Sequence, residues 1–362
     1  MKRVLIIGGY GNFGSFISRR LAGVSNLHII IAGRSEKKAQ LLAREINAAA
    51  IALDIHDNLD TCLRETQPDI VIHTSGPFQS QGYSVAEACI EFGAHYIDLA
   101  DGRDFVANIN VLDNKARQAG VLVVSGASSV PCLTSALIDH YQQEFEQLQS
   151  IDYGITTAQQ TARGLATTAA ILSYTGKSFK TRIDGEAKEI YGWQGLRARK
   201  YPELGWRLLG YCNIPDLELF PKLYPNIKTI KFYAGLEIPF IHLALWLLSW
   251  LVRARLIGNL QRSAPILLKL SFLFDWLGSS NSGFHMELQG TDKHGESKSV
   301  RFELTARDGD GPYIPCMPAI LLAEKLANQE LTATGATPCI GLITRDEYLD
   351  ALGKLNISWT ES

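Results

Sequence analysis

The sequence lacks a strong net charge, closely spaced cysteines and an apolar run of membrane-spanning length. Its 35 basic and 37 acidic residues give a formal net charge of −2 over 362 residues, so nothing attracts the whole chain to nucleic acid. The six cysteines are scattered, without the spacing of a metal site or a redox pair. We therefore expect reduced thiols in a cytoplasmic protein, with no disulfide and no metal. The apolar run Val4–Ile7 stops at Gly8, far short of the core of a signal peptide.

Motifs of hydrolases and metalloproteases are also missing. There is no G-x-S-x-G turn and no H-E-x-x-H helix, and the eight histidines show no paired spacing. These absences argue against triad hydrolysis and against zinc chemistry.

The composition predicts a folded chain with more than one core. Apolar residues make up 46% of the chain and charged residues 20%, as in globular proteins. A chain of 362 residues is too long for one ordinary core, so we expect two lobes.

Apolar β-branched runs alternate with helical patterns over about the first 125 residues. The predicted strands are Arg3–Ile7, Leu27–Ala32, Ala50–Leu53, Ile70–His73, Tyr96–Leu99 and Val121–Ser125. The predicted helices are Gly14–Ala22, Ser35–Ile46, Leu59–Thr66, Gly82–Phe92 and Phe105–Ala119. Six strands with five crossovers are typical of a Rossmann fold, a doubly wound parallel sheet.

The pattern changes after Val130 and Pro131. A helix at 133–145 leads to longer and more mixed elements, among them two antiparallel strands at Gly283–Thr291 and Lys298–Asp308. A last helix is expected at Pro318–Ala327. The predicted fold class is α/β, with a Rossmann domain over 1–130 and a second α+β domain from residue 131.

A complete G-x-G-x-x-G motif leaves the first strand and opens the first helix. It reads Gly9, Tyr10, Gly11, Asn12, Phe13, Gly14. Gly9 permits the tight turn, Gly11 lets the backbone approach a pyrophosphate, and Gly14 lets the helix pack on the strand. The helix N-terminus adds amide donors. The alternative is a simple strand–helix turn, but the strand, glycines, helix and second strand together favour a dinucleotide site.

The end of the second strand favours NADP over NAD. An NAD-binding chain carries an acidic residue about twenty positions after the motif, for the ribose 2′-hydroxyl. This chain has Arg34 there, followed by Ser35 and Lys38. A guanidinium pairs with a 2′-phosphate, and Ser35 and Lys38 can add a hydrogen bond and a charge. The alternative is a solvated arginine beside a helix cap.

Two later strand ends should border the same crevice. Asp54 and Ile55 follow the third strand, where a carboxylate can accept a hydrogen bond from the adenine amino group. Ser75, Gly76, Pro77 and Phe78 follow the fourth strand, where a nicotinamide would lie. Ordinary loop chemistry is the alternative for both.

With these residues in view, the chain resembles the saccharopine dehydrogenase-like oxidoreductases over about its first 140 residues. Beyond the glycine motif, the resemblance rests on Ala32–Ser35, Leu53–Ile55, Ser75–Phe78, Val85–Cys89, Gly93–Leu99 and Leu112–Val121. It implies an NADP-binding lobe at 1–130, a substrate and dimerisation domain at 131–312, a segment at 313–362 that returns to the first lobe, and hydride transfer.

The resemblance does not extend to saccharopine as the substrate. Typical saccharopine reductases carry an Asp-Pro-Gly turn after the sixth strand, where this chain has Gly126-Ala127-Ser128. The chain is more similar to a broad branch of the family that includes reductases of lipid-like double bonds.

Hydride transfer to C=N, C=O or C=C needs a donor at the atom that becomes negative. Asp98 and Asp101 follow the fifth strand and are candidate acids, with a helix cap or turn as the alternative role. Arg163 precedes an apolar helix at Leu165–Tyr174, where it can clamp a substrate carboxylate or phosphate. A solvated arginine is the other interpretation.

One apolar segment, Ile238–Val252, does not fit a simple surface helix. At about 100° per residue, His242, Ser249 and Arg253 form a narrow polar line on an otherwise apolar helix. Its fifteen residues fall short of the roughly twenty that span a bilayer. The segment is either buried between lobes or in a dimer interface, or it forms a lipid-facing wall or a peripheral membrane contact.

The sequence thus predicts an NADP(H)-dependent oxidoreductase, cytoplasmic and homodimeric, that acts on an unidentified small or lipid-like molecule. The alternative is a non-catalytic NADP(H)-binding sensor or regulatory protein.

Overall fold

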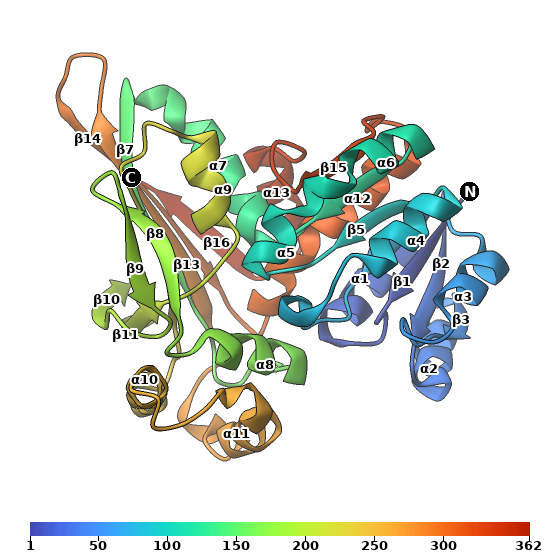
Figure 1. The fold of residues 1–362 in the computed structure, drawn as a ribbon, viewed down its shortest axis with the longest axis horizontal. Helices are drawn as coiled ribbons and strands as arrows, with labels where there is room; N and C mark the ends of the chain where they lie inside the picture. The colour runs from blue at the N-terminus through green and yellow to red at the C-terminus, as the bar shows by residue number, and fades with distance from the viewer. The chain divides into compact units, whose positions relative to one another are not determined.

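The structure is a computed structural model that describes all 362 residues and divides into two compact units (Figure 1). The first unit holds Met1–Ala136 and Tyr313–Ala351, and the second holds Leu137–Pro312 and Leu352–Ser362. The last residues thus differ from the expected division, in which all of 313–362 returns to the first lobe. The reason is that the terminal strand β16 (Ile357–Glu361) pairs antiparallel with β14 (Ser297–Ala306) of the second unit.

A seven-stranded parallel sheet forms the first unit, in the order β15-β6-β5-β4-β1-β2-β3. Its strands are β1 (Lys2–Ile7), β2 (Leu27–Gly33), β3 (Ala49–Ala52), β4 (Ile70–His73), β5 (His95–Asp98), β6 (Leu122–Ser125) and β15 (Gly335–Pro338). Its helices are α1 (Asn12–Ala22), α2 (Glu36–Ile46), α3 (Leu59–Thr66), α4 (Ser84–Phe92), α5 (Arg103–Ala107), α6 (Asp113–Ala119), α12 (Met317–Ala327) and α13 (Arg345–Leu352). The predicted Rossmann architecture is confirmed.

Helices cover both faces of this sheet, which is why its strands read as continuous apolar runs. On one face α1 packs with α2 and α12, and on the other α4 packs with α3 and α6. The core on the second face joins strand residues such as Leu5, Val71 and Val123 to helix residues such as Cys89 and Ala116. The strand order reverses between β1 and β4, and this switch point positions the site described below.

A mixed seven-stranded sheet forms the second unit, in the order β10-β11-β12-β7-β13-β14-β16, with a separate hairpin β8–β9. The strands not yet given are β7 (Gln147–Thr156), β8 (Ser178–Ile183), β9 (Glu186–Tyr191), β10 (Arg197–Tyr201), β11 (Gly205–Tyr211), β12 (Thr229–Gly235) and β13 (Ser282–Thr291). The helices are α7 (Thr134–Tyr141, which begins in the first unit), α8 (Leu165–Tyr174), α9 (Asp216–Leu223), α10 (Pro239–Arg253) and α11 (Ala264–Phe272). Only β7 and β12 pair in parallel, so this is the expected α+β domain.

Helix α10 forms over the predicted apolar segment, but its polar line faces inward. His242 and Ser249 are fully buried, and the His242 ring lies 5.5 Å from the buried Trp193 ring, centroid to centroid. The apolar side chains on the opposite side of α10 are exposed. The helix is therefore not buried within the chain, because His242, Leu245 and Ser249 pack on the protein while most of its other apolar side chains face away. None of the helices is long and apolar enough to cross a membrane.

Candidate functional site

The glycine loop joins β1 to α1 at the switch point of the parallel sheet. A Cβ atom on Gly14 would lie 2.2 Å from the Gly8 oxygen, and one on Gly9 would lie 2.9 Å from the Ile6 oxygen. No side chain fits at either position, which accounts for two of the three predicted glycines. Gly11 is the helix N-cap, with extended backbone angles and only a 3.1 Å approach to the Gly8 oxygen.

Gly8 is a further essential glycine that the motif did not single out. Its φ is +77°, and a Cβ there would lie 2.6 Å from the Ser75 Oγ and 2.7 Å from the Thr74 Oγ1. The end of β1 thus touches the loop after β4. The doublet Gly8-Gly9 is the signal that could have revealed this contact.

The first turn of α1 can bind an anion. The amides of Asn12, Phe13 and Gly14 precede the first intrahelical hydrogen bonds, and no acidic residue lies in this turn. Asn12 is exposed. A loop whose glycine positions exclude side chains, followed by free amides and a positive helix end, fits the pyrophosphate of a dinucleotide.

Tyr10 connects the glycine loop to the end of β2. Its hydroxyl accepts a hydrogen bond of 2.8 Å from the Ser35 amide, and a Cβ on Gly33 would lie 2.5 Å from its ring. The Ser35 Oγ in turn accepts from the Lys38 amide and caps α2. The alternative role of Arg34, as part of the helix cap, is therefore taken by Ser35.

Arg34 and Lys38 are exposed cations without an acidic partner at the carboxyl end of β2. The nearest acid in the first turn, Glu36, accepts a hydrogen bond from Gln40. Two free cations beside the glycine loop fit the 2′-phosphate of NADP.

The residues after β3 form a local turn. The Asp54 Oδ1 accepts from the His56 amide at 3.1 Å, and the Asp54 amide donates to the Asn58 side chain at 2.9 Å. Ile55 packs at the edge of the core. Asp54 retains a second carboxylate oxygen, so its predicted contact with adenine stays a prediction beside this turn-forming role.

The loop after β4 lies where the nicotinamide was expected. The Gly76–Pro77 peptide is cis, and the Gln81 side chain donates to the Ser75 oxygen at 2.7 Å and to the Pro77 oxygen at 3.2 Å. Phe78 is buried beneath, with its ring centroid 5.0 Å from that of His73. Ser75, Gly76 and Pro77 stay partly accessible at the switch point.

Asp98 is a buried anchor between β5 and β6. Its Oδ1 accepts from the Ala100 amide at 2.9 Å, the Gly126 amide at 2.8 Å and the Ser125 Oγ at 3.0 Å, while its Oδ2 has no partner. Burial raises the pKa of this carboxyl to about 6, against the lowering effect of those hydrogen bonds. With no exposed surface, Asp98 can position the loop after β5 but does not itself reach solvent.

Asp101 lies in the same loop and is half-buried, so part of its side chain is accessible. Its Oδ1 accepts a 2.9 Å hydrogen bond from the Gln79 side chain, which comes from the loop after β4. Burial raises the pKa of the Asp101 carboxyl. The structure therefore brings Asp101 and the predicted nicotinamide loop together at the carboxyl edge of the sheet.

The charge of Arg163, in the second unit, is balanced by an ion pair within the protein. Its guanidinium pairs with Asp275, donates to the Gln159 oxygen, and lies 4.6 Å from the centre of the Phe272 ring. The guanidinium thus holds α11 and the residues after it to the loop before α8.

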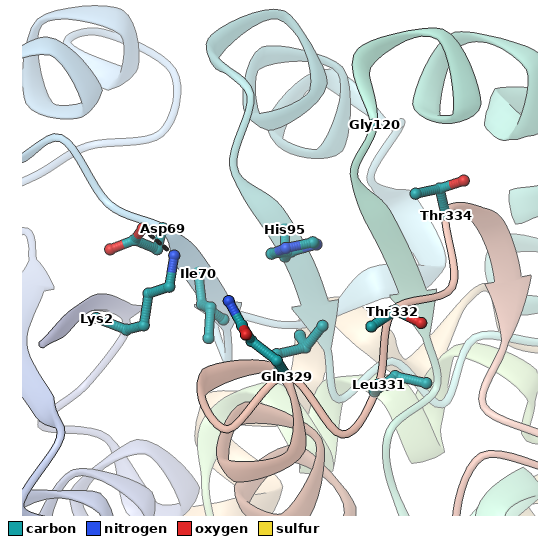
Figure 2. Close-up of a pocket in the computed structure, with 10 residues that line it drawn as sticks. Lys2, Asp69, Ile70, His95, Gly120, Gln329, Leu331, Thr332 and Thr334 are labelled. Carbon is teal, nitrogen blue, oxygen red and sulfur yellow. Dashed lines mark hydrogen bonds and ion pairs between the residues drawn. The ribbon is translucent and has the colours of Figure 1, made fainter.

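A cavity of about 500 Å³ lies at the other end of the parallel sheet (Figure 2). Lys2, Ile70 and His95, at the amino ends of β1, β4 and β5, line it together with residues that follow α12, and Lys2 forms a 2.8 Å ion pair with Asp69. Because dinucleotides bind at the carboxyl ends of such strands, this cavity is not the cofactor site. No three side chains of metal-binding type lie together in the structure.

Comparison with known proteins identifies the first unit. The family model of the saccharopine dehydrogenase NADP binding domain matches residues 4–124. This part of the chain is therefore similar to the NADP-binding domain of saccharopine dehydrogenases. The family resemblance and NADP as the cofactor are thereby confirmed.

Several curated relatives match about a third of the chain. A lipid droplet localized protein of Caenorhabditis elegans is 30% identical over 143 residues, which cover 35% of this chain and 34% of that protein. A saccharopine dehydrogenase-like oxidoreductase of Rattus norvegicus is 28% identical over 152 residues, 36% of this chain and 35% of that one. The chain thus matches about a third of the length of these relatives.

The fold similarity extends over the whole chain. The apo saccharopine dehydrogenase (L-Glu forming) of Saccharomyces cerevisiae covers 100% of both chains with a TM-score of 0.69 and 13% identity. At this identity the match shows the fold of both domains and nothing about the substrate.

Proposed function

We propose that the protein is an NADP(H)-dependent oxidoreductase that transfers hydride to or from a C=N, C=O or C=C bond of a small or lipid-like molecule. The observation that carries the proposal is the glycine loop, in which Gly8, Gly9 and Gly14 leave no room for a side chain, beside two unpaired cations, Arg34 and Lys38. The cofactor supplies the hydride chemistry when it is bound, and the protein supplies the binding and the protons.

The proposed cofactor site extends over four strand ends, those of β1, β2, β3 and β4. The amides after Gly11 face the pyrophosphate, Arg34, Ser35 and Lys38 hold the 2′-phosphate, and Asp54 and Ile55 border the adenine. The Ser75–Phe78 loop, braced by Gln81, forms the floor under the nicotinamide. These roles follow from the place of each residue at the carboxyl edge of the sheet.

Asp101 is our preferred proton donor. It is accessible, it is hydrogen-bonded to Gln79, and its raised pKa keeps the acid form present at higher pH than for an ordinary aspartate. We assign Asp98 a positioning role in the loop that carries Asp101. Arg163 is a weaker candidate, because its charge is matched by Asp275.

A non-catalytic NADP(H) sensor is the second candidate. Two of the three predicted catalytic groups favour it, because Asp98 and Arg163 are engaged in contacts within the protein. Only Asp101 among them remains partly accessible. A sensor predicts NADPH binding that Asp101→Asn leaves intact, together with no NADPH oxidation against any imine, carbonyl or enoyl compound offered.

The exposed apolar side of α10 favours a lipid-like substrate or a lipid surface over burial of this helix within the chain. The homodimer and the cytoplasmic location, like the identity of the substrate, are further parts of the proposal. The six cysteines, all buried and free, are consistent with a reducing compartment.

Calorimetric titration of the whole chain with NADPH and NADH tests the cofactor site. We expect tighter binding of NADPH, and a loss of about tenfold to a hundredfold in NADPH affinity for Arg34→Ala, because one charge-assisted hydrogen bond contributes about 1.5–3 kcal/mol. NADH affinity should not change. Arg64→Ala, which removes an exposed arginine from α3, is the control. Equal binding of both nucleotides by the wild type would contradict the assignment of Arg34.

A further inference from the structure

Helices α10 and α11 each expose large apolar side chains to solvent. We call this surface the apolar face and define it by Phe240, Leu247, Trp250, Ile266, Leu273 and Trp276, each of which is between 43% and 77% exposed. The two helices lie side by side in Figure 1, and the Phe240 and Phe274 rings meet edge to face at 5.2 Å. Folded proteins rarely expose this many large apolar side chains in one patch without a partner.

The orientation of α10 is fixed by its contacts with the second unit. The buried residues His242, Leu245 and Ser249 project about 150° away from the exposed ones on the helical wheel. A Cβ on Gly176 would lie 2.3 Å from the Ser249 oxygen, so only a glycine allows this close approach. Arg253 donates to the Gln194 side chain at 2.7 Å. The polar side of the helix therefore belongs to the protein, and the apolar side is left for a partner.

The charge around the apolar face has one sign. Between Ile238 and Phe274 there is no acidic residue, and the cations are Arg253, Arg255, Arg262 and Lys269, in a chain with a net charge of −2. Arg255, Arg262 and Lys269 are exposed and have no acidic partner.

The two acids next to this segment are each paired with an arginine. Glu237 accepts from Arg207 and from the Ser279 hydroxyl, and Asp275 pairs with Arg163. The apolar face therefore lies in a rim of unopposed positive charge.

We propose that the apolar face docks on the surface of an anionic lipid bilayer. Aromatic and leucine side chains enter the boundary between headgroups and acyl chains, and Arg255, Arg262 and Lys269 pair with lipid phosphates. A second copy of the chain fits less well, because a two-fold interface would set the cationic rim against itself. The docking is independent of hydride transfer, and it rests on and deepens the lipid contact named in the proposed function.

Vesicle flotation of the whole chain with bound NADPH tests the proposal. The probes are vesicles of phosphatidylcholine, and vesicles of equal parts phosphatidylcholine and phosphatidylglycerol. We expect the protein to float with the anionic vesicles and to do so less as salt is added. Failure to float with anionic vesicles at low salt would overturn the proposal.

Two matched pairs of variants separate the apolar and the charged contributions. Leu247→Gln with Leu273→Gln should lower the affinity for anionic vesicles about tenfold or more. Leu41→Gln with Val111→Gln, two exposed apolar residues of the first unit, should not. Replacing Arg255, Arg262 and Lys269 by Gln should lower the affinity for anionic vesicles about fivefold per residue. The control is the same change at three exposed lysines elsewhere in the second unit, which should leave the affinity unchanged: Lys228, Lys293 and Lys354.

Two readouts distinguish the remaining outcomes. NADPH titration of each variant should match the wild type, so a failure of lipid binding leaves the cofactor assignment unaffected. If the wild type sediments as a dimer and the Leu247 and Leu273 variant as a monomer, the apolar face binds a second copy and the lipid proposal is wrong. Equal flotation of the wild type and all variants would also overturn it.

Discussion

Asp98 is the residue whose burial most changes its chemistry. A carboxylate with no exposed surface is costly to ionise, and three donors on one oxygen offset only part of that cost. The free energy of unfolding therefore depends on pH through the ionisation of Asp98. The folded state raises the pKa of Asp98 from 3.8 to about 6, so its stabilising contribution is full below about pH 4 and is lost as the pH rises through 6.

Replacing Asp98 by asparagine should flatten this pH dependence. The shift corresponds to about 3 kcal/mol that ionised Asp98 costs the folded state at neutral pH. Asp98→Asn keeps the Oδ1 acceptor and removes the charge. Thermal unfolding between pH 4 and 7 should therefore show a smaller loss of stability with rising pH than the wild type. Asp60→Asn, at an exposed acid of α3, should keep the wild-type slope, and identical slopes for all three proteins would contradict the buried-acid interpretation.

At the scale of elements, the sequence predicts the strands and helices that have a clear apolar periodicity, and it misses those that depend on particular local contacts. The first six strands and most helices of the first unit follow from apolar periodicity, within two residues at most strand ends. The sequence of strand β15, Gly-Ala-Thr-Pro, is too short and too polar to be predicted as a strand. The strand forms because it pairs with β6 and because the Asp113 side chain accepts a 2.9 Å hydrogen bond from the Ala336 amide. The helix predicted at 105–119 is instead α5 and α6, separated by the turn at Ile109–Leu112.

The orientation of α10 could not be predicted, because a helix with one polar line satisfies two arrangements. It can bury its apolar side in a core or, as here, pack its polar line on the protein. The same limit applies to side chains after strands. A carboxylate at a strand end is either partly accessible, like Asp101, or a buried anchor, like Asp98, and the choice depends on neighbouring loops that lie far away in the sequence.

The contact between Arg163 and Asp275 should stabilise the attachment of α11. Removing one partner leaves the other charge half-buried and unpaired, so Arg163→Met and Asp275→Asn should each destabilise the second unit. In a double-mutant cycle by urea unfolding, we expect a coupling energy of roughly 1–3 kcal/mol.

The matched control is the exposed pair Lys188–Asp184, where the coupling should stay below about 1 kcal/mol. If Arg163 instead serves a substrate, Asp275→Asn will leave stability unchanged and the coupling will vanish.

At the scale of the molecule, the NADP-binding unit is discontinuous in sequence. Residues from beyond 312 supply β15 and α12, and α12 packs on α1 with Met317, Ile320 and Leu322 buried. Tyr313 stacks on Phe16 of α1 at 4.1 Å between ring centroids. The helix that opens at the glycine loop is therefore held in place by the end of the chain.

A chain that ends at residue 312 should lose NADPH binding, although it keeps every residue of the glycine motif. Removal of α12 uncovers one face of α1, and each large apolar side chain lost from that interface contributes about 1.5–3 kcal/mol. We expect at least a tenfold fall in NADPH affinity by calorimetry, together with rapid proteolysis of residues 1–136. A chain that ends at residue 356 lacks only β16, which belongs to the second unit, and should bind NADPH like the full chain. Undiminished binding by the shorter chain would mean that residues 1–136 form the cofactor domain alone and that the return of the chain serves another purpose.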